Sequence, residues 1–351
     1  MIEEIDSIAG LEALGPEWSE LWSRCTEATP FQNPRWLLPW LRNLYKGGEI
    51  WALAVRCGRR LAGIAPLFIH RHWRNPEVRQ VSFIGAGVSD YLDVLIEPGF
   101  ARSGTVAFFR HLEDRRSRWD VCDFQDLRAA SPLLANAFPV GVHHAVSPCG
   151  ICPVLILPEN MAFLRKSLSA KFRTDLRRAG NRLRNSGDVL FETAAAEALP
   201  EYLNALFRLH SARWQLRHEP GVLCTDEIRN FHREVASGFQ ESGSLRVHGL
   251  RRQGIIAAVV YSFVTGTTAY AYLGGFDPEL ARLSPGSALM EFSIERAIQE
   301  GVREYDFLRK KEEYKYLWGA QDHASRRILA WHSGSLLPSS AFPNDEPREH
   351  D

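Results

Sequence analysis

This sequence contains little lysine, and neither positive nor negative charge is in excess. The 42 basic residues comprise 36 arginines and only six lysines, three of which fall within 310–315. They are balanced by 42 acidic residues, so the formal net charge at pH 7 is zero. This balance excludes the chain-wide basic field of nonspecific nucleic-acid binders and the strongly charged composition of disordered chains. Hydrophobic residues make up 45% of the sequence, which is typical of a globular protein. The length of 351 residues suits two domains or one large α/β domain.

Long apolar runs and a secretion signal are also lacking. The longest apolar run, residues 255–264, is half as long as the roughly 20 residues that a membrane-spanning helix needs. The first ten residues contain neither the basic nor the apolar segment of a signal peptide. Six cysteines are scattered along a chain that is long enough to fold without disulfides. We therefore expect a reduced, cytoplasmic protein with no membrane span.

Cys149 and Cys152 form a single C-x-x-C motif. A redox motif of this kind opens a helix after a strand, whereas this pair is followed by Pro153 and by the strand-like residues 154–157. A zinc site would require a second pair of ligands, and no other metal-ligand spacing occurs in the sequence. We therefore predict two small buried residues in a loop, and no bound metal.

The order of secondary-structure elements repeats once along the chain. In the first copy we expect strands at 51–57, 61–70, 90–98 and 119–127, helices at about 102–116 and near 131–138, and an extended stretch through 142–157. In the second copy we expect strands at 245–251, 255–264, 268–276, 303–309 and 326–333, and helices at about 286–300 and 312–319. Both copies read β-β-β-α-β-α-β. This order predicts an α/β (α+β) protein with two tandem domains, each a mixed, mainly antiparallel sheet flanked by helices.

We expect the domains to be residues 1–157 and 158–335, followed by a polar, proline-rich and disordered tail at 336–351. The second domain includes a helical insert at about 159–242. Within the insert, residues 165–184 hold eight basic residues against one acid, a local charge of +7. An apolar stripe at helical spacing runs through the same segment: Phe172, Leu176, Ala179 and Leu183. This basic helix admits three interpretations: a solvated amphipathic arm, a surface that binds an anionic acceptor such as a nucleotide-sugar or the phosphates of a cofactor, or a surface that binds tRNA.

A turn immediately before the helix of the second copy is the sharpest local feature. Pro285 and Gly286 place the turn, and Ser287 is a plausible N-cap. Small residues let unpaired backbone N–H groups approach a phosphate closely, and the helix dipole favours the anion. The segment either binds a phosphate or simply begins a helix.

In its context this turn resembles the acyl-CoA site of the GNAT acyltransferase superfamily. The resemblance rests on the preceding three-strand meander, on Arg282-x-x-x-Gly286-x-Ala288 and on the helix that follows. It implies that Gly286, Ser287 and Ala288 cradle the CoA pyrophosphate, whereas Arg282 stands one residue farther from the glycine than in the family. The first copy has no such match at 97–106, so we expect acyl-CoA, most simply acetyl-CoA, to bind the second copy alone.

The resemblance extends to a group of bacterial double-GNAT proteins that includes CelD-type proteins of cellulose or exopolysaccharide biosynthesis and is related to Fem-type peptidoglycan peptidyltransferases. Besides 276–290 and 305–319, three motifs carry it: the arginine-rich helix 173–183, LHxxRW at 209–214, and DYLD at 90–93. The resemblance implies substrate-binding roles for Asp90, Tyr91, Arg173, Arg177, His210 and Trp214, although His210 and Trp214, four residues apart, also suit simple packing. One departure is Lys310-Lys311-Glu312, where the group has Gly-Asp-Glu, so the role of the middle carboxylate is lost here.

Acyl transfer to an amine requires a general base, polarisation of the carbonyl and a proton for the leaving thiolate. Backbone N–H groups of Leu273, Gly274 and Gly275 are candidates for polarising the carbonyl. Glu312 or Asp306 is a candidate base, and Tyr314 a candidate proton donor. Lys315 is a candidate partner for a phosphate or a substrate carboxylate. Structural alternatives are that Asp306 faces solvent from a half-buried strand and that Tyr314 and Trp318 form a core pair.

We therefore predict a GNAT-type, acyl-CoA-dependent N-acyltransferase. The amine acceptor would be a sugar or nucleotide-sugar of polysaccharide or cell-envelope biosynthesis. One alternative is a Fem-like peptidyltransferase that uses aminoacyl-tRNA, which the double domain and the basic helix would suit. Another is a non-catalytic accessory of exopolysaccharide synthesis, suggested by the replacement of an acid by Lys311.

Overall fold

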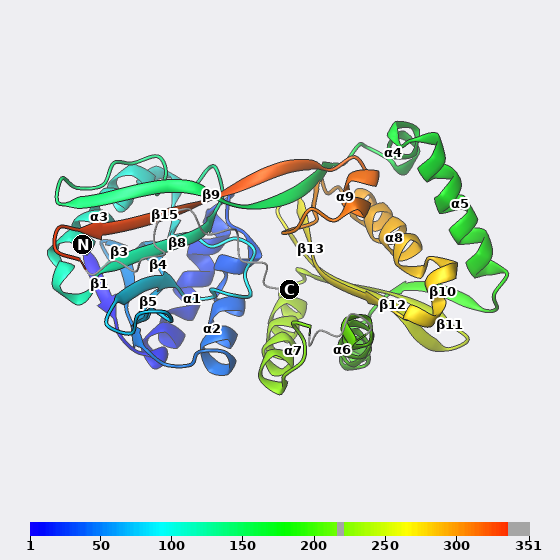
Figure 1. Ribbon diagram of the computed structural model, residues 1–351, viewed down its shortest axis with the longest axis horizontal. Helices are drawn as coiled ribbons and strands as arrows, with labels where there is room; N and C mark the ends of the chain where they lie inside the picture. Colours follow the sequence, from blue (N-terminus) through cyan, green and yellow to red (C-terminus); the bar gives the residue numbers. More distant parts are fainter. Residues whose placement is uncertain (216–220, 336–351) are drawn as a thin grey trace. The chain divides into compact units, whose positions relative to one another are not determined.

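The computed structural model describes residues 1–215 and 221–335, the former without the side chains of 213–215. These residues form two compact units (Figure 1). Unit one comprises Met1–Gly150 and the described residues from Ala324 on, and unit two comprises Ile151–His323. The strand expected at 326–333 therefore belongs to unit one, whereas the sequence placed it in the second domain. The expected tail at 336–351 lies outside the described residues.

Unit one contains two groups of paired strands and three α-helices. One group has the order β1-β3-β4-β7, and the other β15-β8-β6-β5-β2. The strands are β1 (Ile2–Ile5), β2 (Glu49–Ile50), β3 (Ala52–Cys57), β4 (Arg60–Ala65), β5 (Leu67–Arg71), β6 (Arg79–Phe83), β7 (Leu95–Ile96), β8 (Val121–Leu127) and β15 (Gln321–His332). The helices are α1 (Ile8–Arg24), α2 (Pro34–Asn43) and α3 (Ala101–Asp114).

Three expectations for unit one are corrected by these bounds. The single strand expected at 61–70 is divided at Pro66 into β4 and β5, which belong to different groups, because proline has no N–H to donate to a ladder. The strand expected at 90–98 shrinks to β7, and β6, which the sequence reading missed, pairs with β5. The helix expected near 131–138 is a series of turns.

The order of unit two follows the predicted repeat more closely. Its sheet has the order β10-β11-β12-β13-β14-β9, antiparallel throughout except for the parallel pair β13–β14. The strands are β9 (Val142–Ile156), which begins in unit one, β10 (Val189–Thr193), β11 (Leu245–Arg252), β12 (Ile255–Thr265), β13 (Thr268–Phe276) and β14 (Glu304–Asp306). The helices are α4 (Met161–Ser167), α5 (Ala170–Arg184), α6 (Leu199–Gln215), α7 (Asp226–Glu241), α8 (Pro285–Gln299) and α9 (Glu313–Leu317). Figure 1 shows α6 and α7 on one face of the sheet and α8 on the other.

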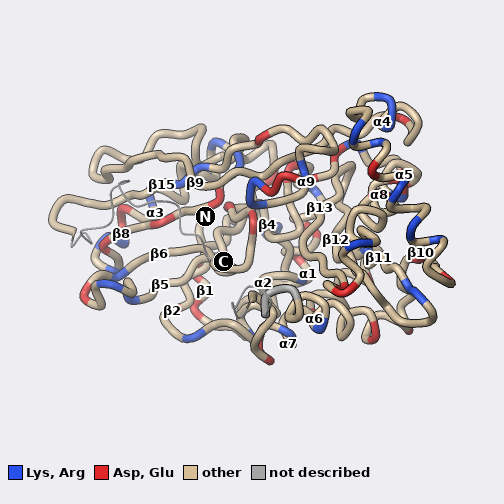
Figure 2. The backbone as a smooth tube through the Cα atoms, turned by 45° about the vertical axis from the view of Figure 1, so that its right-hand side comes forward, with Lys and Arg blue, Asp and Glu red and all other residues tan. Residues whose placement is uncertain are grey.

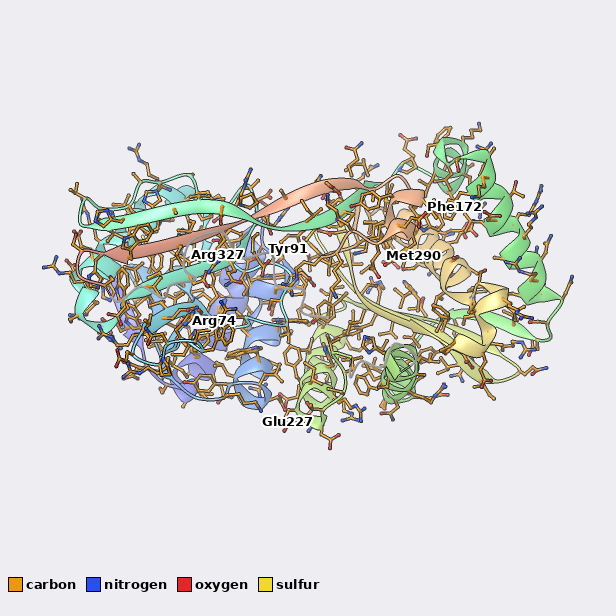
Figure 3. The ribbon with its side chains drawn as sticks, in the orientation of Figure 1. Arg74, Tyr91, Phe172, Glu227, Met290 and Arg327 are labelled. Atoms are coloured by element: carbon orange, nitrogen blue, oxygen red, sulfur yellow. The ribbon has the colours of Figure 1, made fainter. Side chains whose placement is uncertain are left out.

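The core of unit two confirms the predicted stripe of the basic helix. Phe172, Leu176, Ala179 and Leu183 are all buried. The Phe172 ring meets the buried Trp318 ring edge-on at a centroid distance of 5.0 Å, and Met290 of α8 packs against the same cluster (Figure 3). The hydroxyl of Ser169 accepts the N–H of Phe172 and so begins α5. The charged residues of α5 are therefore left on its outer side.

The C-x-x-C motif lies in strand β9 and not in the predicted loop. Cys152 is buried, Cys149 is partly exposed, and both are free thiols. Among the helices of the described residues, none is long and apolar enough to cross a lipid bilayer.

Candidate active site at the junction of β13 and α8

Strands β13 and β14 run side by side for only three residues each. Thr268–Tyr270 pairs with Glu304–Asp306, after which β13 continues alone on that side to Phe276. The N–H of Asp277 donates to the carbonyl of Ala257 at 2.8 Å, at the end of the ladder with β12. Because N–H directions alternate along an antiparallel ladder, Leu273 and Gly275 also donate toward β12 and Gly274 points away from it. Of the three predicted backbone donors, Gly274 is thus the one directed at the side that β14 leaves open.

The beginning of α8 leaves two backbone donors exposed. Ser284, with a left-handed φ of +56°, is the N-cap, but its side chain makes no capping hydrogen bond. Pro285 has no N–H, and the first helical bond runs from the N–H of Ala288 to the carbonyl of Ser284 at 3.2 Å. The N–H groups of Gly286 and Ser287 therefore have no acceptor within the described part of the chain. The prediction that Ser287 is the N-cap is wrong by three residues, because the left-handed turn precedes the proline.

An arginine from α5 reaches the same helix end. Nη2 of Arg182 donates to Oγ of Ser284 at 3.1 Å, so that this hydroxyl binds the guanidinium and does not cap α8. The positive end of the helix dipole, two N–H groups and one guanidinium thus converge on one exposed spot. This combination is suited to bind a phosphate or another multivalent anion. In the sequence, Arg182 is distinguished only as one of the basic residues of segment 165–184.

The predicted pyrophosphate residues differ in their surroundings. A Cβ on Gly286 would lie 3.1 Å from the ring of Phe276, so any larger residue would crowd this corner. Ala288 is buried in the core that α8 forms with the sheet. Arg282 is exposed in the 3-10 turn Pro278–Leu283 and precedes the first of the backbone donors, the Gly286 N–H, by four positions in the sequence.

Lys315 holds the loop that follows β14. It is 1% exposed, and its Nζ donates to the carbonyls of Leu308, Arg309 and Lys310 at 3.1, 2.7 and 2.9 Å. Its three N–H donors are directed at these three carbonyls, with a carboxylate oxygen of Glu312 at 3.4 Å. The prediction that Lys315 contacts a phosphate or a substrate carboxylate is therefore corrected to a structural role.

The three candidate catalytic side chains lie on or beside this loop. Asp306 is 4% exposed and accepts the N–H of Leu308 at 2.8 Å, so the alternative that it faces solvent is wrong. Glu312 is partly exposed and precedes α9. Tyr314 is 39% exposed and does not form a core pair with the buried Trp318. Glu312 and Tyr314 are thus accessible, whereas Asp306 is enclosed.

Lys311, the residue that departs from the resembled group, forms an ion pair. Its Nζ lies 2.7 Å from a carboxylate oxygen of Asp322 at the start of β15, and the two side chains are 58% and 37% exposed. This ion pair connects the loop after β14 to strand β15, so Lys311 serves as a surface contact. Such exposed pairs contribute little to stability.

The other predicted substrate residues are scattered. Nη1 of Arg173 donates to the carbonyls of Arg165, Lys166 and Leu168 and so closes the turn between α4 and α5. Arg177 is exposed on α5, and the side chain of Trp214 lies outside the described residues. Asp90 and Tyr91 are buried in unit one. These positions form no single cluster within unit two.

His210 packs behind β13. It is 5% exposed, and its backbone nitrogen would lie 3.0 Å from a Cβ on Gly275, so this glycine allows α6 to approach the strand. A second buried histidine, His232 of α7, belongs to no sequence motif, and its ring lies 5.5 Å from the ring of Tyr272. Burial, helped by His210, lowers the pKa of His232 to about 3, which keeps this imidazole neutral. The only sequence signal for His232 was its position on the buried stripe of α7.

No group of three or more His, Cys, Asp or Glu side chains that could hold a metal ion occurs within the described ranges 1–215 and 221–335.

Tyr272 lies at an irregularity of the β12–β13 register, where Tyr261 pairs with Leu273 and Ser262 with Ala271. This β-bulge turns the strand just before Gly274. The site is therefore built from backbone donors, one arginine and a carboxylate-bearing loop.

Comparison with known proteins places this geometry in a family context. Residues 170–316 match the family model described as an acetyltransferase (GNAT) domain. The matched segment begins at α5 and ends in α9, so it contains Arg182, the start of α8 and the loop with Glu312. No curated protein matches the chain.

Three solved structures are similar to the chain in fold. FemX has 11% sequence identity and a TM-score of 0.64, and the match covers 90% of this chain and 95% of that one. A conserved protein of unknown function from Bacteroides thetaiotaomicron has 13% identity and a TM-score of 0.56, covering 94% and 100%. L-PGS from Bacillus licheniformis has 12% identity and a TM-score of 0.53, covering 80% and 84%. At these identities the likeness concerns the fold alone. Together with the family match over residues 170–316 and the observed sheets and helices, it confirms the predicted mixed α/β architecture with a GNAT-like domain.

Proposed function

We propose that unit two is an acyl-CoA-dependent N-acyltransferase that binds the CoA pyrophosphate at the start of α8. The observation that carries this proposal is the meeting of the Gly286 and Ser287 N–H groups with the Arg182 guanidinium, within the segment that matches a GNAT domain. Backbone donors at a helix start, reinforced by a guanidinium, match the charge of a pyrophosphate.

The fit of CoA is supported by the shape of this corner as well as by its charge. Gly286 leaves room beside Phe276 that a side chain would fill. When bound, acyl-CoA supplies an activated thioester carbonyl. The Gly274 N–H, which points away from β12, would donate a hydrogen bond to the developing oxyanion, since the neighbouring strand ends at Asp306.

We assign the general base to Glu312 rather than to Asp306. Glu312 is partly exposed and stands beside the Lys315 ammonium, whereas Asp306 is enclosed and already accepts the Leu308 N–H. Tyr314, which is 39% exposed, would return a proton from its hydroxyl to the leaving thiolate. General acid and base groups of this kind each contribute about 10² to 10⁴ in rate.

For the acceptor, we propose an amine on a sugar or nucleotide-sugar used in polysaccharide or cell-envelope synthesis, as the CelD-type resemblance implies. Arg177, Arg178 and Arg184 are exposed on α5, and Figure 2 shows basic residues along α4 and α5. An anionic acceptor would be attracted to this side of unit two.

Calorimetry with CoA and acetyl-CoA tests the donor site. Gly286→Glu should weaken CoA binding about 100-fold, because the added carboxylate would repel the pyrophosphate and obstruct its hydrogen bonds to the two backbone N–H groups. Gly180→Glu is the matched control, since this α5 position has nothing within 4 Å of an added Cβ. Arg182→Ala should cost about tenfold. Equal CoA affinity of Gly286→Glu and wild type would refute the proposal.

A second candidate, transfer from aminoacyl-tRNA, is favoured by one observation: residues 165–184 carry a charge of +7, and α5 exposes most of it. A retardation assay with aminoacylated tRNA at 50 and 200 mM salt decides between the donors, because phosphate contacts give a steep salt dependence. Salt-dependent tRNA binding without CoA binding would favour this candidate. CoA binding without thiol release across a broad panel of amines would favour a non-catalytic accessory instead.

A further inference from the structure

Helices α4 and α5 of unit two carry a dense positive charge, of which the proposed donor site uses only Arg182. All eight basic residues of segment 165–184 are exposed. Figure 1 shows α5 on the outside of α8, and Figure 2 shows basic residues along both α4 and α5. A surface of this kind attracts an anionic partner.

Few acidic side chains offset this charge. Asp175 is the one acid within the segment, and its carboxylate lies 3.9 Å from the Arg178 guanidinium. Glu291 of α8 pairs with Arg165 at 3.0 Å, and Glu159 is exposed just before α4. The surface formed by the two helices therefore keeps a positive net charge.

The basic residues of α5 form two rows on opposite flanks of the helix. At about 100° per residue, positions 171, 178 and 182 share one flank, and positions 173, 177 and 184 share the other. The buried stripe separates the two rows on the inner side of the helix, and the uncharged Thr174 and Asn181 separate them on the outer side. Lys171 and Arg177, one from each row, pair with no acidic side chain within the part of the chain that the structure describes.

One exposed aromatic side chain accompanies the charge. Phe163 of α4 is 51% exposed, and the ammonium of Lys166 lies 5.7 Å from the centre of its ring. The apolar stripe of α5, by contrast, is buried in the core of unit two, so α5 has no apolar side to insert into a bilayer. Contact with a lipid surface would therefore be made by the charges along α5 and by the ring of Phe163.

We propose that α4 and α5 form a docking surface for a bilayer that contains anionic phospholipids. With Thr174 and Asn181 toward the headgroups, both basic rows reach the lipid phosphates, and the exposed Phe163 ring enters the interface. Each basic residue near an anionic surface contributes about fivefold in affinity, which corresponds to about 1 kcal/mol. This docking goes beyond the proposed acyl transfer and does not depend on it.

A bilayer fits this surface better than a nucleic acid does. The 15 residues of α5 extend over about 22 Å, and a plane of phosphates meets both rows along that whole length. The deep, narrow major groove of an RNA duplex does not admit a helix with cations on both flanks. The zero net charge of the whole chain differs from the basic footprint of proteins that bind duplex DNA.

Sedimentation of the full chain with lipid vesicles tests the docking. Vesicles of phosphatidylcholine alone are compared with vesicles that contain about 30% phosphatidylglycerol, at about 50 and 200 mM salt. At the lower salt concentration we expect the affinity for the anionic vesicles to be at least about 100-fold higher than for the neutral vesicles. The difference should shrink at the higher salt concentration, because the charges are screened.

Paired substitutions distinguish a local surface from general attraction. Lys171→Gln combined with Arg177→Gln removes one cation from each row and should weaken binding to anionic vesicles about 25-fold. Arg102→Gln combined with Arg110→Gln removes the same charge from exposed positions of α3 in unit one and should bind like wild type. Phe163→Ser should weaken binding about fivefold at both salt concentrations, because insertion of an apolar ring is not screened by salt.

Equal affinity for the two kinds of vesicle, or equal weakening by the α5 pair and the α3 pair, would overturn the proposal. Tighter binding of tRNA or duplex DNA than of anionic vesicles would also overturn it, since the surface would then serve a nucleic acid. CoA binding, measured in parallel, should be the same in wild type and in the α5 pair. Absence of CoA binding by wild type would contradict only the proposed acyl transfer.

Discussion

The buried carboxyl group of Asp93 should make the stability of unit one depend on pH in an unusual direction. Its pKa is about 7 in the folded protein, against an ordinary value of 3.8, because burial disfavours the charged form. The folded state therefore binds a proton more tightly than the unfolded state does. The stabilisation from this proton is complete below pH 3.8 and is lost as the pH rises to about 7.

The size of the effect follows from the two pKa values. They differ by about 3, and each pKa unit corresponds to 1.36 kcal/mol, so an ionised Asp93 costs up to about 4 kcal/mol above pH 7. Asparagine is uncharged and of nearly the same shape as the neutral acid, and its amide can still accept from Val94. Asp93→Asn should therefore gain about 3 kcal/mol relative to wild type between pH 5 and pH 8.

Urea unfolding followed by tryptophan fluorescence measures this difference. Of the ten tryptophans only Trp214 and Trp318 belong to unit two, so the signal reports mainly on unit one. Asp114→Asn, which changes an exposed carboxylate of the same unit, should show no such pH dependence. If Asp93→Asn lost stability relative to wild type on going to pH 8, the carboxylate would be held as an ion by Arg128 and the reasoning would be refuted.

Three further changes test the packing of unit two by thermal unfolding. Gly249→Ala should destabilise unit two by about 1–3 kcal/mol, since a Cβ at this position would lie 2.1 Å from the Tyr202 ring. Gly180→Ala, by contrast, should stabilise α5 by about 0.5–1 kcal/mol. If both variants changed the stability in the same way, the packing of α6 on β11 would be contradicted. Lys315→Met should cost about 3 kcal/mol or more, because three carbonyls lose their buried donor, and wild-type stability would show that these bonds are dispensable. Trp318→Ala should cost about 3–5 kcal/mol, and a loss below 1 kcal/mol would disprove its place in the core.

The succession of strands and helices in the second half was predictable because its signals are local. Alternating apolar residues in β11–β13, the 3.6-residue stripe of α5 and the Pro-Gly start of α8 each depend on neighbours along the chain. Short elements were less predictable. β10 and β6 are strands of five residues each. β10 pairs with β11, more than 40 residues farther along the chain. β6 pairs with its hairpin partner β5 and with β8, whose paired residues lie about 40 positions away.

The chemistry of the candidate site depended on contacts that no local pattern contains. Arg182 and Ser284 are 102 residues apart, and only the packing of α5 on α8 brings their polar atoms together. The sequence predicts Lys315 as a ligand-binding base, whereas in the structure three carbonyls of the preceding loop accept hydrogen bonds from its ammonium. Asp93 looked like one more polar residue of a motif, and only burial by two distant segments gave its carboxyl group an altered affinity for protons. Periodicity and turn chemistry thus decide which elements form, whereas burial and long-range pairing decide which of their polar groups remain available for a ligand.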